Sequence, residues 1–364
     1  MESSFHQITS ERGSIKRLSR RRWIGSLIAG SVGLGLSSAI QGGTVNAFAA
    51  EANSKWEKST ERGLAWLAKQ QTRLGQWNHK AYPTAITALA GTALIASGST
   101  TTQGPYAKHI RRTVDFLLSK CRKNGLIGDP QRDNRYTYGH GFSMLFLSQV
   151  MGEEEDTDRR SELSEVLERA VKFSIDAQTK AGGWGYVSGK RSDFDEGSTT
   201  ITQVQGLRGC RNAGIVVPTK AIDIAKKYIY DCQNDDGGIS YSSTTKGTSR
   251  AAITAAALAA LNNAGDYENE QIEPMWKYCK GKLHNVSARN YGHWHYTYLY
   301  YAQVVYRRGP KEWKPFRDKL YNKIVSQQLQ DGRWTDESNG DDYVTACNLI
   351  MLQLDNGFLP IYQR

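Results

Sequence analysis

The sequence predicts an all-α protein in which six pairs of helices close into a ring. Three observations lead to this prediction. A seven-residue pattern, Gln-x-x-x-Gly-x-Trp, recurs along the chain in one register. Each copy follows a charged segment whose apolar residues recur at helical spacing. Each copy also precedes a shorter and more apolar segment that ends at a glycine, the residue that most often terminates helices.

The repeated pattern is complete in three copies, which begin at Gln71, Gln178 and Gln328. A fourth copy, at Gln233, has Ile in place of Trp, and two degenerate copies keep only the spacing. A glycine in each copy is expected at the turn between two helices: Gly75, Gly125, Gly182, Gly237, Gly292 and Gly332. The glutamine amide is expected to bond carbonyl groups left free at the helix end.

The two helices of each pair differ in their charge. The first segments, such as 55–71, 157–178 and 313–330, carry charge on one face, which predicts an outer position in contact with water. The second segments carry almost no charge and are predicted to lie inside: 84–96, 142–151, 202–213, 251–264, 296–306 and 343–354. An open solenoid is the competing arrangement, but it needs polar capping repeats. The last repeat is as apolar as the others, so we expect closure.

The first fifty residues have the features of a targeting segment. Ser19-Arg20-Arg21-Arg22-Trp23-Ile24 resembles the twin-arginine export signal, and Ala47-Phe48-Ala49 matches a cleavage pattern. We therefore expect residues 1–50 to be a signal peptide, residues 51–364 to form one domain, and the protein to be exported to the periplasm or the exterior. The competing interpretation is an uncleaved membrane anchor, because the eighteen uncharged residues 23–40 would span about 27 Å as a helix.

Composition and charge exclude several classes of protein. The chain has 364 residues, a net charge of +11 and 39% hydrophobic residues, which suits a core but not a multi-span membrane protein. No spanning apolar run follows residue 50. The positive charge is dispersed, so we expect no nucleic-acid partner. The five cysteines are widely spaced and contain no C-x-x-C, which predicts free buried thiols and neither a disulfide framework nor a thiolate zinc site.

The repeats resemble those of the terpenoid-cyclase and protein-prenyltransferase superfamily. The Gln-x-x-x-Gly-x-Trp copies are similar to the QW repeats of squalene and oxidosqualene cyclases, and Thr84-Ala85 and Thr345-Ala346 are similar to that family's inner-helix starts. The resemblance covers residues 55–360 and implies a single α/α toroid of six inner and six outer helices. The zinc site of protein prenyltransferases has no matching Asp-x-Cys here, so we expect no metal and no cofactor.

In such a toroid the loops after the Trp positions and the starts of the inner helices meet at one mouth of the ring. The repeat register places these residues there: His79, Tyr82, Tyr136, Tyr138, His140, Asp193, Asp195, Glu196, Arg250, His293, His295, Tyr298, Asp341, Asp342 and Tyr343. The mouth is therefore expected to be polar and aromatic.

The segment Asp193-Phe194-Asp195-Glu196 is similar to the D-x-D-D proton-donor motif of squalene-hopene-type cyclases. Clustered carboxyls that share a proton can supply the strong acid that protonates an alkene. In the family Thr-Ala follows the motif directly, whereas residues 197–200 intervene here, which predicts that the carboxylates lie in a loop ahead of the inner helix. The alternative is helix capping by Asp195 and Ser198.

Three functions remain open, each with a small hydrophobic or glycan ligand in the central cavity. The first is acid-initiated cyclisation of an isoprenoid, with Asp193, Asp195 and Glu196 as the catalytic acids. The second is a secreted polysaccharide lyase-like toroid, in which an arginine or lysine binds a uronate and a base removes a proton. The residues that support it are His140, His295, Tyr138 and Arg250. The third is a non-catalytic binding or scaffold toroid. The expected ligand-contacting residues are Tyr82, Tyr138, His140, Arg250, Trp294, His295, Tyr298 and Asp342.

Overall fold

The computed structural model describes residues 42–187, 194–286, 293–336 and 340–363. Within these residues every regular element is a helix, apart from the two isolated β-bridges Cys121–Ile127 and Gln233–Ile239. The predicted all-α fold is therefore confirmed. Most of the predicted targeting segment, residues 1–41, lies outside the described residues.

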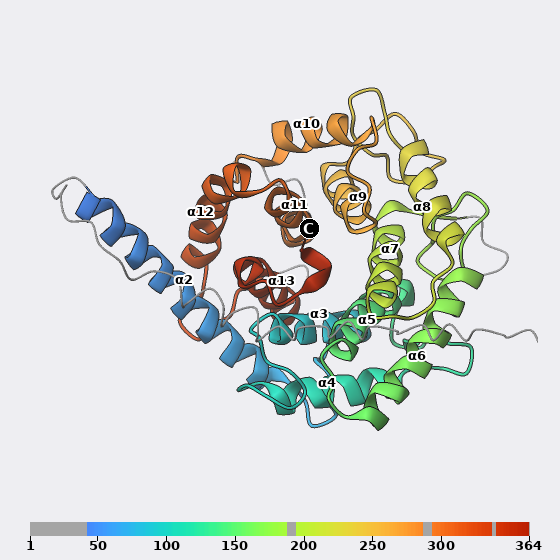
Figure 1. Cartoon of the computed structure of the whole chain (residues 1–364), viewed down its shortest axis with the longest axis horizontal. Helices are drawn as coiled ribbons and strands as arrows, with labels where there is room; N and C mark the ends of the chain where they lie inside the picture. Colours follow the sequence, from blue (N-terminus) through green and yellow to red (C-terminus); the bar gives the residue numbers. More distant parts are fainter. Residues whose placement is uncertain (1–41, 188–193, 287–292, 337–339, 364) are drawn as a thin grey trace, which may run out of the picture. The chain divides into compact units, whose positions relative to one another are not determined.

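In the described part of the chain twelve α-helices alternate between an outer and an inner position (Figure 1). The outer helices are α2 (Gly42–Gln70), α4 (Ala107–Ser119), α6 (Thr157–Asp176), α8 (Thr219–Asp231), α10 (Ile272–Leu283) and α12 (Pro310–Ser326). The inner helices are α3 (Pro83–Ile95), α5 (Tyr136–Met151), α7 (Gly197–Asn212), α9 (Ala251–Asn263), α11 (Trp294–Arg307) and α13 (Asp341–Leu352). Helices α5 and α7 begin earlier than the sequence predicts, because polar residues and glycines form their first turns.

The inner helices form a closed ring, because each contacts the next and α13 contacts α3 (Figure 1). Gln353 Nε2, just after α13, donates to the carbonyl of Ala93 in α3 at 3.1 Å. The first and last outer helices are joined as well, since Gln328 Nε2 donates to the carbonyl of Ser59 in α2 at 2.8 Å. Closure is confirmed, and the open solenoid is excluded.

The repeat glutamines connect neighbouring repeats. Gln71 Nε2 donates to the carbonyl of Gly75 at 3.0 Å and to that of His109, in the first turn of α4, at 2.9 Å. The other three motif glutamines make equivalent pairs of bonds: Gln178, Gln233 and Gln328. We expected each glutamine amide to bond the free carbonyls at the end of the helix before it, and the amides do not form those bonds. Each amide instead reaches the next outer helix.

The motif tryptophans and glycines fix the turn between the two helices of a pair. Trp77, Trp184 and Trp334 are at most 2% exposed, and each indole N–H donates to a carbonyl of the preceding outer helix at 2.7 to 2.8 Å. Gly75 has a φ of 91°, and a Cβ there would lie 2.0 Å from the carbonyl oxygen of Arg112. Only glycine fits that position. These motif residues maintain the fold and carry no chemistry.

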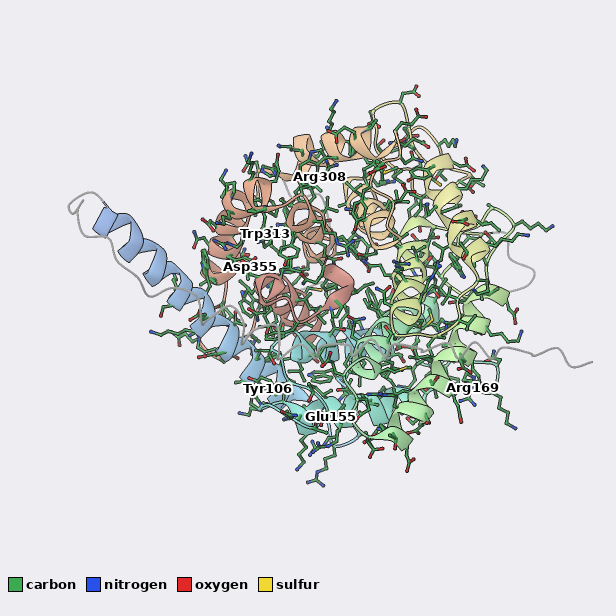
Figure 2. All side chains as sticks on the ribbon, viewed as in Figure 1. Tyr106, Glu155, Arg169, Arg308, Trp313 and Asp355 are labelled. Atoms are coloured by element: carbon green, nitrogen blue, oxygen red, sulfur yellow. The ribbon has the colours of Figure 1, made fainter. Side chains whose placement is uncertain are left out.

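The C-terminal segment lies at the end of the ring where the inner helices finish. It contains the short 3₁₀ helices η1 (Leu354–Asn356) and η2 (Pro360–Tyr362), in which Leu354, Ile361 and Tyr362 are buried. Asp355 accepts a hydrogen bond of 2.5 Å from the indole of Trp313 in α12 (Figure 2). The segment is therefore held against the outer helices.

A hydrogen bond crosses the inside of the ring. Gln205 Nε2 of α7 donates to Gln303 Oε1 of α11 at 3.2 Å, and both side chains are 1% exposed. Each lies some eight or nine residues into its helix, or about 13 Å from the helix start. The bond therefore connects two inner helices that are not neighbours in the ring.

All five cysteines are free, and four of them are buried: Cys210, Cys232, Cys279 and Cys347. The predicted absence of a disulfide framework is confirmed. Among the helices that the structure describes, none is long and apolar enough to cross a membrane.

Candidate functional site at the mouth of the ring

Aromatic side chains gather where the inner helices begin. We define the tyrosine cluster by six half-buried residues: Tyr82, Tyr138, Tyr186, Tyr241, Tyr296 and Tyr343. The ring of Tyr138 lies 6.1 Å from that of Tyr82 and 6.0 Å from that of Tyr186, and the hydroxyls of Tyr186 and Tyr241 are hydrogen-bonded. Burial raises the pKa of Tyr296 and Tyr343, and the nearby Tyr138 raises both further. Tyr296 and Tyr343 therefore stay neutral, and the cluster presents aromatic rings and hydroxyl groups.

Glu196 lies beneath the tyrosine cluster as the N-cap of α7 and is fully buried. Its carboxylate accepts hydrogen bonds from the backbone N–H groups of Ser198 and Thr199, at 2.9 and 2.6 Å, and from the hydroxyl of Tyr138 at 3.1 Å. The Ser198 hydroxyl lies 2.6 Å from Glu196 and 2.5 Å from the Tyr138 hydroxyl. Burial, followed by the charge of Glu196, raises the pKa of Tyr138. Tyr138 thus remains a hydrogen-bond donor.

The prediction that the carboxylates lie in a loop ahead of the inner helix is wrong for Glu196. Residues 197–200 form the first turn of α7, so Glu196 stands directly at the helix start. The structure has a capping residue here, as the alternative interpretation anticipated, but that residue is Glu196 and not Asp195 or Ser198. A carboxylate at this point is stabilised by the free N–H groups and the positive end of the helix dipole.

Asp195 faces the outer helices. It is 3% exposed and accepts hydrogen bonds from the hydroxyl of Tyr228 in α8 at 2.7 Å and from that of Ser243 at 3.2 Å. Asp195 and Glu196 therefore bond different groups on opposite sides of the chain. Their contacts do not support the expectation that the two carboxyls share a proton. The third member of the predicted cluster, Asp193, lies outside the described residues.

His140, expected to contact a ligand, belongs to the repeat framework. It is fully buried, its Nδ1 accepts from the N–H of Ile127 at 3.1 Å, and its Nε2 donates to the carbonyl of Ala170 at 3.1 Å. Threonines fill the equivalent position in four other repeats: Thr87, Thr200, Thr254 and Thr345. Burial lowers the pKa of His140 to about 4, so the ring is neutral at pH 7.

Tyr298 also faces away from the mouth. It is 2% exposed, its hydroxyl donates to the carbonyl of Leu283 at 3.0 Å, and its ring stacks on Phe316 of α12 with 6.5 Å between centroids. Trp294 is half-buried, and its ring lies 4.6 Å from that of Tyr298. Trp294 is the first residue of α11, whereas the other motif tryptophans precede their inner helices. The degenerate motif copy that ends at Trp294 therefore departs from the register of the others.

The remaining predicted residues lie at inner-helix starts. His295 is half-buried with its Nδ1 3.7 Å from Asp336, and burial lowers its pKa to about 4 although Asp336 opposes the shift. Arg250 is exposed at the N-cap of α9. Asp342 is half-buried in the first turn of α13, where burial and then the charge of Asp341 raise its pKa to about 6.

Sequence reasoning missed Arg135, Tyr186, Tyr241 and Tyr296. The three tyrosines each stand two residues after the last motif position, where the first repeat has His79. Arg135 is the N-cap of α5, and its guanidinium lies 3.9 Å from the ring centre of Tyr186. The repeat register could have identified the arginine and the three tyrosines. The N-caps of the inner helices and the residues just after each motif lie at the same end of the ring. Among the described residues no group of three or more His, Cys, Asp or Glu side chains is placed to hold a metal.

Comparisons with known proteins agree with this architecture. The family model of the prenyltransferase alpha-alpha toroid domain matches residues 44–200 and 207–295. No curated protein matches the chain. A variant of the type II terpene cyclase MstE from Scytonema with its substrate geranylgeranyl dihydroxybenzoate is similar, with a TM-score of 0.56 and 15% identity over 86% of this chain and 99% of that chain.

Two further solved structures are similar. A second variant of MstE, with its product merosterolic acid A, has a TM-score of 0.58 and 15% identity over 86% of this chain and 99% of that chain. A protein from Actinoplanes has a TM-score of 0.52 and 13% identity over 84% of this chain and 99% of that chain. At such identities the likeness concerns the fold.

Proposed function

The chain belongs to the prenyltransferase alpha-alpha toroid domain family, and from this premise we propose that it is a terpene-cyclase-like enzyme that closes rings in an isoprenoid. The observation that carries the proposal is the buried Glu196 carboxyl, hydrogen-bonded to the hydroxyl of Tyr138 in the tyrosine cluster. An acid placed under aromatic faces suits a reaction that begins with a proton and proceeds through carbocations.

In the proposed reaction Glu196 takes up a proton from solvent and gives it to a carbon–carbon double bond of the substrate. The alkene electron pair forms the new C–H bond and leaves a carbocation, which the faces of the tyrosine cluster stabilise. A second double bond attacks this cation and closes a ring, and transfer of a proton from a neighbouring carbon to water forms the product. The hydroxyls of Ser198 and Tyr138 can accept as well as donate hydrogen bonds, so they can also hold the protonated carboxyl.

The depth of the ring restricts the proposed substrate. The Gln205–Gln303 hydrogen bond lies about 13 Å from the inner-helix starts. This depth favours a short or compactly folded isoprenoid bound near the mouth. The aromatic rings and hydroxyl groups at the mouth favour a ligand with an apolar chain and a polar end.

A comparison of two carboxyl variants tests the proposal. Purified protein would be incubated with geranylgeraniol and with geranylgeranyl diphosphate, and the products analysed by mass spectrometry. Glu196→Gln keeps an acceptor for the helix cap and should lower turnover by about 10²- to 10⁴-fold. Asp195→Asn, the neighbouring carboxyl that faces α8, is the matched control and should lower the thermal midpoint while turnover per folded molecule stays within a few-fold. Turnover by Glu196→Gln at the wild-type rate would refute the assignment.

A non-catalytic binding toroid is the second candidate. It is favoured by the full use of the Glu196 carboxylate as a helix cap, which fixes it as an acceptor. Saturable isoprenoid binding without products would support this candidate. The polysaccharide lyase-like alternative loses one of its bases, because His140 is sealed in the repeat framework.

We also propose export through the twin-arginine-like segment. Helix α2 is continuous from Gly42, across the expected cleavage site. The packed part of α2 includes Trp56, whose indole donates to Asn322 at 3.0 Å. Cleavage after Ala49 would therefore keep this contact with α12.

A further inference from the structure

Two arginines lie about one helical turn beyond the hydrogen-bonded pair Gln205–Gln303, toward the end of the ring opposite the tyrosine cluster. Arg208 lies on α7, and Arg307 is the last residue of α11, about 20 Å along that helix from the mouth. Arg307 is only 6% exposed, and Arg208 is half-buried. Burial lowers the pKa of Arg307, and the charge of Arg208 lowers it further. Within the part of the chain that the structure describes, neither arginine forms a salt bridge.

Each of the two guanidinium groups has an N–H donor without a hydrogen-bond acceptor among the described residues. Arg307 donates through Nε to the carbonyl of Tyr362 at 3.2 Å and through Nη2 to that of Ile361. Its Nη1 is buried without a partner among the described residues, and so is Nε of Arg208. Helix α9 packs between α7 and α11 (Figure 1) and ends at Asn263, whose side-chain oxygen and nitrogen are likewise buried and unpaired in the described structure.

This arrangement is costly without a counter-charge. Burying a cation is unfavourable unless it is paired and hydrogen-bonded, and buried N–H groups are almost always satisfied. The C-terminal ends of α7, α9 and α11 supply partial negative charge, but they do not accept the unpaired donors of Arg208 and Arg307. The planar fork of a guanidinium matches the two oxygens of a carboxylate or phosphate.

We propose that Arg208, Arg307 and Asn263 form a binding site for an oxyanion, a carboxylate or a phosphate group, at the C-terminal ends of the inner helices. The anion pairs with both cations and accepts from their unpaired N–H groups, while the Asn263 amide donates to it. Because Arg307 also holds Tyr362 and Ile361, anion binding strengthens the attachment of the C-terminal segment. The site is independent of the proposed cyclase activity.

Thermal unfolding of the full chain in three sodium salts tests the proposal. Phosphate, acetate and chloride would be compared at pH 7 and equal ionic strength, so that general screening is the same. A bound oxyanion at a hundredfold excess over its Kd should raise the Tm above that in chloride by about 5 °C. A rise with phosphate alone identifies a phosphate site, and a comparable rise with acetate identifies a carboxylate site.

Two variants of α7 make the test specific. Arg208→Gln should abolish the oxyanion-dependent rise and the single-site phosphate signal in titration calorimetry. It should fold, because the Arg208 side chain makes no hydrogen bond among the described residues. Arg211→Gln removes an exposed arginine of the same helix and should respond like the wild type. Equal Tm values of the wild type in all three salts, or an unchanged response of Arg208→Gln, would overturn the proposal.

Discussion

The hydroxyl of Tyr138 lies 3.1 Å from Glu196 Oε1 and joins the second inner helix to the start of the third. This contact depends on two features of the repeat. Glu196 caps α7, so its carboxylate is fixed by the backbone of the first turn. Tyr138 stands in the first turn of α5, so its side chain lies at the same end of the toroid as Glu196. The contact therefore places an acid and an aromatic face together at the mouth.

Loss of Gln328 should weaken closure of the ring. Its amide nitrogen donates to the carbonyls of Ser59 and Gly332, both at 2.8 Å. Gln328→Ala leaves the Ser59 carbonyl without this donor and should lower the free energy of unfolding by about 2 kcal/mol, measured by urea denaturation. Gln327→Ala, at the exposed neighbouring position, is the control and should change it little. Equal effects of the two variants would mean that the bond does not stabilise closure.

The fold was predictable because its determinants are local and repeated. The spacing from Gln71 to Trp77 recurs around the ring, and each copy fixes one turn. The partner of Gln71 was not predictable, because His109 belongs to the next outer helix and becomes adjacent only after the helices pack. Sequence periodicity gives the elements, whereas contacts between elements depend on their arrangement in space.

Truncation of a motif tryptophan should be severe. Trp184 is 1% exposed, and its indole N–H donates to the carbonyl of Ser174 at 2.8 Å. Trp184→Ala should cost about 3 kcal/mol or more, because it leaves a cavity and an unpaired carbonyl. Trp294→Ala, at a half-buried position, should cost less. A denaturation midpoint of Trp184→Ala equal to that of the wild type would contradict the packing.

Burial of neutral His140 should make stability depend on pH. Its pKa is lowered in the folded state to about 4 from 6.5, so only the unfolded chain takes up a proton as the pH falls below 6.5. Stability from this residue is present above pH 6.5 and is lost as the pH falls toward 4. The loss between pH 7.5 and pH 5 should be about 2 kcal/mol.

The variant His140→Gln can keep both backbone hydrogen bonds without titrating. Its free energy of unfolding should fall by about 2 kcal/mol less than that of the wild type between pH 7.5 and pH 5. Part of the dependence should remain, since burial also lowers the pKa of His295 to about 4. Parallel pH profiles of the variant and the wild type would show that His140 is not responsible.

The exported protein should begin near Ala50. Ala47-Phe48-Ala49 follows a basic and then an uncharged stretch, the order found in signal peptides. Mass spectrometry of the periplasmic or secreted fraction should detect a chain without residues 1–49, and Arg20→Lys together with Arg21→Lys should abolish its appearance. A full-length chain in the membrane fraction would favour the anchor.

The candidate site was only partly predictable, for reasons that individual residues make clear. Glu196 and Tyr138 were expected at the mouth because the repeat register puts helix starts there. The sequence could not separate Asp195 from Glu196, because one backbone step turns the first toward Tyr228 and the second toward Tyr138. His140 was misplaced because the sequence does not reveal that it replaces a framework threonine.

The most direct test of acid-initiated cyclisation is deuterium incorporation. Wild-type protein would be incubated with geranylgeraniol in D₂O, and the cyclic product examined by mass spectrometry and NMR. Because the acid exchanges its proton with solvent before each turnover, the product should carry one carbon-bound deuterium, at the former CH carbon of the protonated double bond, and Glu196→Gln should form no labelled product. A cyclic product without deuterium, or labelling that persists in Glu196→Gln, would contradict the mechanism.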